Sequence, residues 1–315
     1  MNGFEKNTLG LKQPQGYPGL PDSWESECES FLASDGQSKL FALFHHRKNS
    51  APLQKILVVA HGFGEHGGRY LHFPHYLGDS IDALYVHDLR GHGRSEGMRG
   101  DAPSFESLVE DQKLVIKRIH ARFPDAELHF LGHSIGGHIG LRVGFLHAGL
   151  PLKTFQISAP YLALYQEPAL ALRVAAGVLA KTWSSLSLSA DIDASLVSRD
   201  ERVIENYATD RLNHARMSPR FYASMKIAQK DTRSRVSGLN YPLSLHLPLA
   251  DRLISAKVSR EFFDALQNEG KQLFEYPELR HEAMNDIGKE AFFENMKTVI
   301  DHSEMRDSEK TSVQK

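Results

Sequence analysis

The sequence predicts an α/β fold, with a mostly parallel, doubly wound sheet and a helical cap inserted after the sixth strand. Short apolar runs alternate with helix-like segments before residue 160 and again after residue 236, a rhythm typical of parallel strands linked by helices. Between them, about seventy residues are helical and polar in character and contain no convincing strand pattern. We therefore expect one core, formed by residues 23–160 and 236–301, and a cap over residues 161–235.

The two ends of the chain differ from this core in composition. Residues 1–22 are rich in Gly, Pro and polar residues, which predicts an irregular leader. Residues 302–315 are charged and predict a frayed tail.

The elements of the core follow in order. Two β-like runs between Trp24 and His46, separated by Ser34-Asp35-Gly36, indicate a hairpin. Further strands are predicted at 56–60, 83–87, 126–131, 154–158, 241–247 and 272–276. Helices are predicted at 68–79, 104–122, 256–269 and 288–301, and apolar residues recur at helical spacing from Ile135 to Leu146. The run 56–60 is apolar throughout, as expected of a strand buried on both faces.

Composition limits the classes of partner. The chain has 315 residues, with 37 Lys and Arg against 39 Asp and Glu, so a net charge of −2 predicts no nucleic-acid partner and leaves any lipid contact local and apolar. The single Cys28 forms no internal disulfide. We find no signal-peptide pattern and no run of about 20 apolar residues, and therefore expect a cytoplasmic protein.

The segment Gly132-His133-Ser134-Ile135-Gly136 carries the clearest chemistry. It places a serine in the Gly-x-Ser-x-Gly frame between a predicted strand and a helical pattern, which is the nucleophile elbow of an α/β-hydrolase fold. The glycines leave space where side chains would collide with the neighbouring strand or helix. Ser134 is thus the candidate nucleophile; the alternative is a serine in an ordinary βα loop.

A serine nucleophile needs a histidine base and an acid that orients it, and in this fold they follow the serine in the order acid, histidine. Asp251 comes just after the strand ending near residue 247, and His281 just after the strand ending near residue 276. Both therefore lie at the carboxyl edge of the sheet, as the elbow does. Asp264 and Asp286 are rival acids, but they fall in predicted helical segments.

The tetrahedral intermediate also needs two backbone N–H donors. The residue after the nucleophile, Ile135, is one candidate, and Phe63, in the glycine-rich turn after the strand 56–60, is the other. The alternative for Phe63 is a side chain that plugs the core.

Three successive segments carry a family resemblance. Residues 61–70 (HGFGEHGGRY), 88–97 (DLRGHGRSEG) and 132–137 (GHSIGG) resemble the motifs of the monoacylglycerol lipase and lysophospholipase family, and the similarity runs from about residue 25 to 300. Residues 195–200 of the cap also resemble the family pattern. The resemblance implies serine hydrolysis of single-chain lipid esters with no metal or organic cofactor.

The same resemblance implies the roles already expected: nucleophile for Ser134, acid for Asp251, base for His281, and oxyanion donors at Phe63 and Ile135. There are two departures. Where the family has a His-Gly pair before the acid, this chain has Leu-Pro at 247–248, which predicts a loop of different shape, and residue 63 is smaller in the family.

The expected reaction is hydrolysis of monoacylglycerol to fatty acid and glycerol through an acyl-enzyme. A lysophospholipase and a general carboxylesterase remain open alternatives, as does a catalytically silent binding module. The oligomeric state is not predicted.

The cap contains an unusually apolar helix, predicted over residues 168–182, in which only Arg173 and Lys181 are clearly polar. It either roofs an acyl tunnel and presents its other side to a micelle or membrane, or is buried within the cap or a dimer contact. The surroundings of the histidines at 66, 72 and 75 lack the carboxylates or cysteines of a closed metal site, so we expect no metal.

Overall fold

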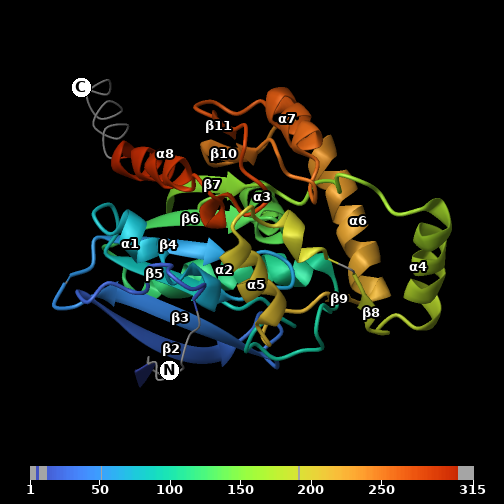
Figure 1. Cartoon of the computed structure of the whole chain (residues 1–315), viewed down its shortest axis with the longest axis horizontal. Helices are drawn as coiled ribbons and strands as arrows, with labels where there is room; N and C mark the ends of the chain where they lie inside the picture. The colour runs from blue at the N-terminus through green and yellow to red at the C-terminus, as the bar shows by residue number, and fades with distance from the viewer. Residues whose placement is uncertain (1–4, 7–12, 51, 191, 304–315) are drawn as a thin grey trace.

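The computed structural model describes residues 5–6, 13–50, 52–190 and 192–303 (Figure 1). Within this part, nine strands form one sheet in the order β1-β2-β3-β5-β4-β6-β7-β10-β11. Their bounds are β1 Glu5–Lys6, β2 Trp24–Leu32, β3 Lys39–Arg47, β4 Lys55–Ala60, β5 Ala83–His87, β6 Glu127–His133, β7 Leu152–Ser158, β10 Leu243–Pro248 and β11 Gln272–Tyr276. The pairs from β1 to β5 are antiparallel, whereas β5, β4, β6, β7, β10 and β11 run parallel. The carboxyl ends of six strands therefore meet at one edge.

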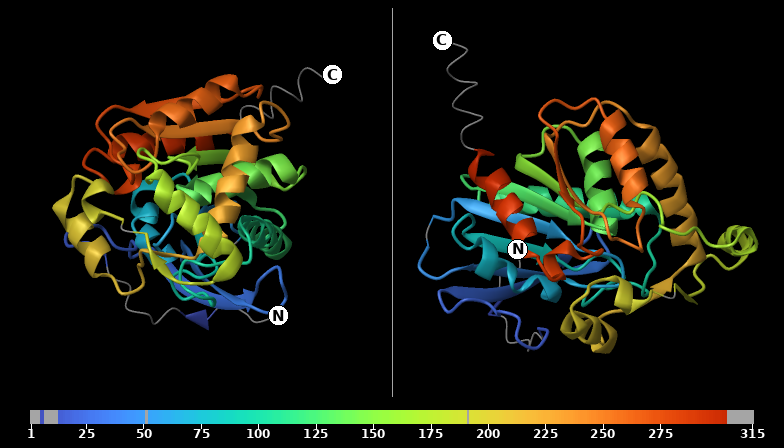
Figure 2. Two further views of the ribbon diagram at one scale, coloured as in Figure 1. Left: turned by 90° about the vertical axis from the view of Figure 1, so that its right-hand side faces the viewer. Right: turned by 45° about the horizontal axis from the view of Figure 1, so that its top comes forward.

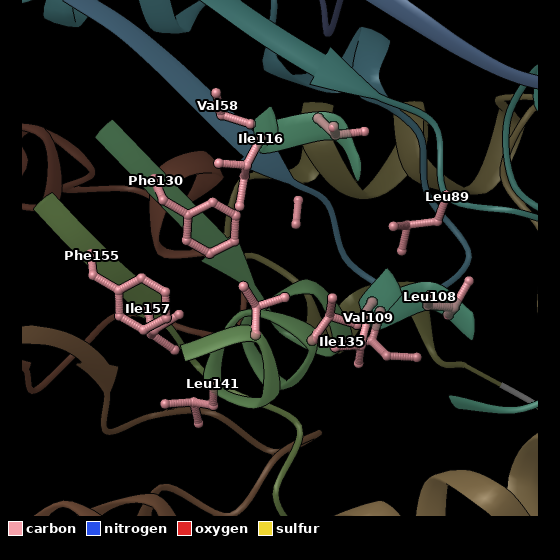
Figure 3. Packing of buried hydrophobic residues seen from close by; sticks show 14 of the residues in the cluster. Val58, Leu89, Leu108, Val109, Ile116, Phe130, Ile135, Leu141, Phe155 and Ile157 are labelled. Carbon is pink, nitrogen blue, oxygen red and sulfur yellow. The ribbon is translucent and has the colours of Figure 1, made fainter. Parts of the chain in front are cut away.

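Helices cover both faces of the sheet. They are α1 Phe73–Leu77, α2 Phe105–Arg122, α3 Ile135–Leu146, α6 Pro219–Ser234, α7 Ala256–Ala265 and α8 Glu290–Asp301. One face packs against α2, α3, α6 and α7, and the other against α1 and α8. Phe130 of β6 and Phe155 of β7 stack with ring centroids 5.4 Å apart in the first of these cores (Figure 3). The doubly wound α/β prediction is confirmed.

The cap lies between β7 and β10. It contains α4 Leu170–Thr182, β8 Leu188–Ser189, the 3-10 turn η2 Ala194–Leu196, α5 Glu201–Thr209, β9 Arg216–Met217 and α6. In Figures 1 and 2, α4 lies at the outer edge of the molecule, away from the sheet. The division at residues 161 and 235 stays a prediction.

The cap contacts the core at close range beside Gly100. A Cβ atom on this residue would lie 1.6 Å from the carbonyl oxygen of Arg216, and its φ is +68°. The backbone N–H of Ser218 donates to the carbonyl of Gly100 at 3.0 Å. Only glycine lets the cap backbone approach this closely.

Four details differ from the expectations. The leader, expected to be irregular over residues 1–22, contributes β1, which pairs with the edge strand β2. The cap, expected to lack strands, contains the short antiparallel pair β8–β9. The helix expected at 68–79 is split into the 3-10 turn η1 Gly67–Tyr70 and α1, because Pro74 favours a new helix start. The helix α7 ends at Ala265 rather than near residue 269. Of the predicted tail, residues 304–315 lie outside the described residues.

Candidate active site

Ser134 occupies the sharp turn between β6 and α3. Its φ is 55° and its ψ is −116°, a combination that costs a non-glycine residue free energy. A Cβ atom on Gly136 would lie 2.1 Å from the carbonyl oxygen of Ala60, so glycine is required at this position of the elbow. The Ser134 side chain is only 5% exposed and lines a cavity.

Asp251 and His281 meet at the carboxyl edge of the sheet. The Nδ1 atom of His281 lies 2.7 Å from Oδ2 of Asp251. The other carboxylate oxygen accepts hydrogen bonds from the backbone N–H groups of Leu253 and Ile254, at 2.8 and 2.9 Å. With Nδ1 bonded to the acid, Nε2 is left as the basic atom, and His281 lines the same cavity as Ser134.

The pKa of His281 is raised above its ordinary value of 6.5. Burial acts to lower it, but the carboxylate of Asp251 outweighs this effect, and Glu282 and Glu65 add to the attraction. His281 is therefore a stronger base than an isolated histidine.

The rival acids lie elsewhere. Asp264 is an exposed residue of α7. Asp286 was expected in a helix but instead follows a 3-10 turn. Its Oδ2 atom lies 3.1 Å from Nε of Arg199. Asp286 thus binds a cap arginine, whereas Asp251 binds His281.

Pro248 ends β10 without displacing Asp251. It pairs with Tyr276 of β11, while the pairing of β10 with β7 stops earlier, at His246. Proline lacks an N–H donor, but none is needed on the side where β7 has already separated. The loop that follows still brings Asp251 to His281.

The two expected oxyanion donors lie on separate elements. Phe63 is in the loop after β4, and Ile135 is the first residue of α3. In the part of the chain that the structure describes, no protein acceptor binds either backbone N–H. The Phe63 ring packs edge-on against His92 of the core and His214 of the cap, with centroids 5.3 and 5.5 Å away, and borders the cavity.

A buried ion network adjoins the loop after β4 that carries Phe63. Arg69 donates to Oε2 of Glu65 at 2.6 Å and to both oxygens of Glu282 at 2.6 and 2.7 Å. Oε1 of Glu65 accepts from the backbone N–H of Gly62 at 2.5 Å and from the Tyr70 hydroxyl at 2.9 Å. Burial opposes ionisation of Glu282, but Arg69 holds its pKa below the ordinary value. Through its bond to Gly62, Glu65 braces the loop that carries Phe63.

Sequence reasoning did not identify several polar side chains of the cavity wall. They include His133, Tyr207 and Glu282. The sequence signal for His133 and Glu282 was their place beside the candidate nucleophile and the candidate base; Tyr207 had no comparable signal. The Tyr207 ring lies 4.8 Å from the guanidinium of Arg69, so the cap also contacts the ion network.

The cavity has a volume of about 410 Å³. The catalytic candidates and the ion network supply its polar wall, and the cap and the segment after Asp251 supply apolar side chains. The apolar group includes Leu164, Leu172, Ile192, Met217, Leu253 and Ile254. Such a wall suits a ligand with one long apolar part and one small polar part.

The described residues contain no group of three or more His, Cys, Asp or Glu side chains placed to hold a metal ion. His66 instead binds Asp210 of the cap, with 3.0 Å between Nε2 and Oδ2. No helix among the described residues is long and apolar enough to cross a bilayer.

Comparison with known proteins agrees with this fold. Residues 51–288 match the Hydrolase_4 family, described as serine aminopeptidase, S33. The chain is 32% identical over 232 residues to a monoacylglycerol lipase of Mycolicibacterium smegmatis, covering 73% of this chain and 82% of that protein. It is 28% identical over 251 residues to the monoglyceride lipase of Mus musculus, covering 79% and 81%.

Solved structures are similar as well. The crystal structure of the Paleococcus ferrophilus monoacylglycerol lipase gives a TM-score of 0.71 at 26% identity, covering 78% of this chain and 94% of that one. A soluble variant of the Saccharomyces cerevisiae monoglyceride lipase, in complex with a substrate analog, gives 0.75 at 19% identity and supports the fold alone. The elbow, the sheet topology and these matches place the chain in the Hydrolase_4 family of α/β-hydrolases, with monoacylglycerol lipases among its relatives.

Proposed function

We propose that the protein is a serine hydrolase that cleaves monoacylglycerol to fatty acid and glycerol. The observation that carries the proposal is the 2.7 Å bond between His281 and Asp251, beside a cavity that Ser134 also lines. A strained serine, a histidine base and an oriented acid are the parts that acyl transfer needs.

The reaction proceeds in two halves. His281 takes the proton of the Ser134 hydroxyl through Nε2, and the serine oxygen attacks the ester carbonyl. The backbone N–H groups of Phe63 and Ile135 hold the negative oxygen of the tetrahedral intermediate. His281 then gives its proton to the leaving glycerol, and water attacks the acyl-enzyme in the same way.

The charge beside the site favours a neutral leaving group over a phosphate. Glu65 and Glu282 lie in the cavity wall, and both are bound to the single guanidinium of Arg69. A phosphate there would meet the Glu282 carboxylate, the buried carboxyl group of Glu65 and a cation that is already paired. This supports monoacylglycerol over lysophospholipid, and relatives named as monoacylglycerol lipases support the same choice.

The test is fatty-acid release from long-chain monoacylglycerol, lysophosphatidylcholine and a short p-nitrophenyl ester. Wild type is compared with Ser134→Ala and with a control, Ser185→Ala, in the exposed part of the cap. We expect monoacylglycerol to be turned over fastest, and only Ser134→Ala to lose activity. Preference for either other ester would favour a lysophospholipase or a carboxylesterase. A folded wild type no faster than Ser134→Ala would favour a binding module.

We further propose that α4 contacts a lipid surface. None of its residues is buried, and its apolar side chains include Leu170, Val174 and Val178, which are 71%, 58% and 56% exposed. Trp183, just after the helix, is 70% exposed. Exposed apolar side chains on one helix beside the cavity suit insertion into the headgroup region of a bilayer.

This contact is tested by sedimentation with phosphatidylcholine vesicles. The double variant Val174→Asp and Val178→Asp should lose vesicle binding yet keep activity on a short soluble ester. Leu32→Asp, which changes an exposed residue of β2, is the control. If the double variant instead converts a dimer to a monomer and leaves vesicle binding intact, α4 is a contact between two copies. A cytoplasmic location stays a prediction.

A further inference from the structure

The loop that carries His281 is held in part by the cap. The backbone N–H of Glu282, the residue after His281, donates to the carbonyl of Val197 in the cap at 2.9 Å. The backbone N–H of Arg280, the residue before it, donates to Oδ2 of Asp286 at 2.7 Å. Both N–H groups that flank the base are therefore fixed, and neither partner lies in a strand.

Asp286 connects this loop to the cap. Its side chain is fully buried, and its Oδ2 atom also accepts from Nε of Arg199 at 3.1 Å. Its Oδ1 atom accepts from the backbone N–H of Arg199 at 2.6 Å. Arg199 belongs to the cap segment 195–200, to which the expected mechanism gives no task. One carboxylate thus binds both this segment and the backbone next to His281.

The side chain of Arg280 makes a second connection between the same two segments. Its Nη1 atom donates to the carbonyl oxygens of Ser195 and Ser198, at 2.5 and 3.0 Å. Hydrogen bonds in which one partner is charged are shorter and stronger than neutral ones. The cap segment 195–200 and the loop of His281 are therefore joined by charged groups on both sides.

The chemistry depends on where this loop lies. Nδ1 of His281 lies 2.7 Å from Oδ2 of Asp251, and Nε2 of the same ring has to reach the hydroxyl of Ser134. A misplacement of about 1 Å at a catalytic site can cost about 100-fold in rate. Loops are the more mobile parts of a fold, so a base that lies on one needs support from its surroundings. The contacts with the cap supply such support.

We infer that Asp286 is a positioning residue, which holds the loop of His281 against the cap segment 195–200 so that the base reaches both Ser134 and Asp251. The inference rests on the proposed function, but only on serine hydrolysis itself and not on the identity of the alcohol. Asp286 is not part of the cavity wall and acts through His281 alone. The cap thereby contributes to the chemical step as well as to the cavity.

The experiment measures kcat, KM and the pH dependence of kcat/KM on a short soluble p-nitrophenyl ester. In Asp286→Ala we expect kcat to fall about 100-fold with KM nearly unchanged, because the base is displaced while the cavity keeps its wall. Asp286→Asn keeps an acceptor for the backbone N–H of Arg280 and should retain more of kcat. It also provides the test if Asp286→Ala fails to fold.

The midpoint of the acid limb distinguishes positioning from a through-space effect of charge. Burial lowers the pKa of His281, but the carboxylate of Asp251 outweighs it and holds the pKa above 6.5. If the loop moves away from Asp251, the midpoint should fall in Asp286→Ala and, by less, in Arg199→Gln, which keeps its backbone contact. Through space alone, loss of the anion would lower the midpoint, and loss of the cation would raise it.

Asp101→Asn is the matched control for Asp286→Asn. Asp101 is also a buried carboxylate of the core that binds the cap, through the hydroxyl of Ser218 at 2.5 Å and Nε of Arg220 at 2.7 Å. Among the described residues, its side chain binds no group of the His281 loop. This variant should lower the melting temperature through the loss of a cap contact, yet keep kcat and the acid-limb midpoint.

The outcomes separate the inference from the proposed function. A wild type no faster than Ser134→Ala would overturn the proposed function, and the inference with it. An active wild type whose kcat and midpoint survive Asp286→Ala would overturn the inference alone. Midpoints that move in opposite directions in Asp286→Ala and Arg199→Gln would do the same. So would an equal loss of kcat in Asp101→Asn and Asp286→Asn, because any contact between cap and core would then have this effect.

Discussion

The hydrogen bond between Oδ2 of Asp251 and Nδ1 of His281 joins two loops that lie 30 positions apart in the chain. Each residue follows a strand, β10 or β11, and those strands pair in parallel register up to Pro248 and Tyr276. Because the two strands pair in parallel, the loops that follow them lie side by side and bring Asp251 next to His281.

Replacing Asp251 with Asn should abolish most of the activity with little loss of fold. An amide at this position favours the wrong tautomer of the histidine, and the corresponding change in a serine protease lowers kcat about 10⁴-fold. The measurement is kcat on a soluble ester, with folding checked by circular dichroism. Asp264→Asn on α7 is the control and should keep kcat. Activity that survives Asp251→Asn would contradict the assignment of the acid.

Activity should fall on the acid side at a pH above the ordinary histidine value. Only neutral His281 accepts the serine proton, and its pKa is raised above 6.5 because Asp251 outweighs burial. The midpoint of the acid limb of kcat/KM, measured from about pH 5 to about pH 9, should therefore exceed 6.5. In Asp251→Asn the residual activity should show a lower midpoint. An unchanged midpoint in that variant would mean that the carboxylate does not set the pKa of His281.

The folded protein should lose stability steeply as the pH falls below 6.5, and His45 should account for part of that loss. Burial, with a smaller effect from His46, lowers the pKa of His45 from 6.5 to about 3. The unfolded chain binds this proton below pH 6.5, but the folded chain does not until about pH 3. The contribution is therefore present above pH 6.5 and is lost as the pH falls, by about 1.4 kcal/mol per pH unit.

Urea unfolding at several pH values measures this effect. Neither ring nitrogen of His45 has a partner among the described residues, so His45→Leu breaks no hydrogen bond. The free energy of unfolding of this variant should decline less steeply with acid than that of wild type. Identical slopes for the two proteins would show that His45 is protonated in the folded state.

The leader should hold the cap to the core through Tyr17. Its hydroxyl donates to the carbonyl of Asn285 at 2.8 Å, and its ring lies under Lys289 of the core and Arg202 of α5, at 4.5 and 5.5 Å. Tyr17→Phe should cost about 1 kcal/mol and Tyr17→Ala about 3 kcal/mol, and only the second should speed proteolysis within the cap. Thermal unfolding and limited proteolysis measure both. Equal stability of Tyr17→Ala and wild type would mean that Tyr17 does not stabilise the contact between the cap and the core.

The parts of the site that follow a strand could be predicted from the sequence. Ser134, Asp251 and His281 each come after an apolar run, and the order of strands brings such loops to one edge. Contacts between distant segments had no such signal. Arg69 and Glu282 lie 213 positions apart, and nothing in either segment indicates the other.

The cap was less predictable for a related reason. Its short pair β8–β9 has two residues in each strand, too few for any periodicity. Tyr207 reaches the ion network only because α5 lies over it, a matter of tertiary packing. The sequence left the partner of α4 open between lipid and protein, because an exposed apolar helix face suits either one.

The backbone of Ser134 makes activity and heat tolerance competing properties at one position. A residue at φ 55° and ψ −116° costs about 1–3 kcal/mol of folding free energy. Glycine avoids this cost but adds an entropic cost of about 0.5–1 kcal/mol, so its net gain is at most about 2.5 kcal/mol. Ser134→Gly should thus be inert and yet melt a few degrees above wild type. Selection of variants for thermal stability alone would favour loss of the nucleophile, so any such screen of this enzyme needs turnover as a second criterion.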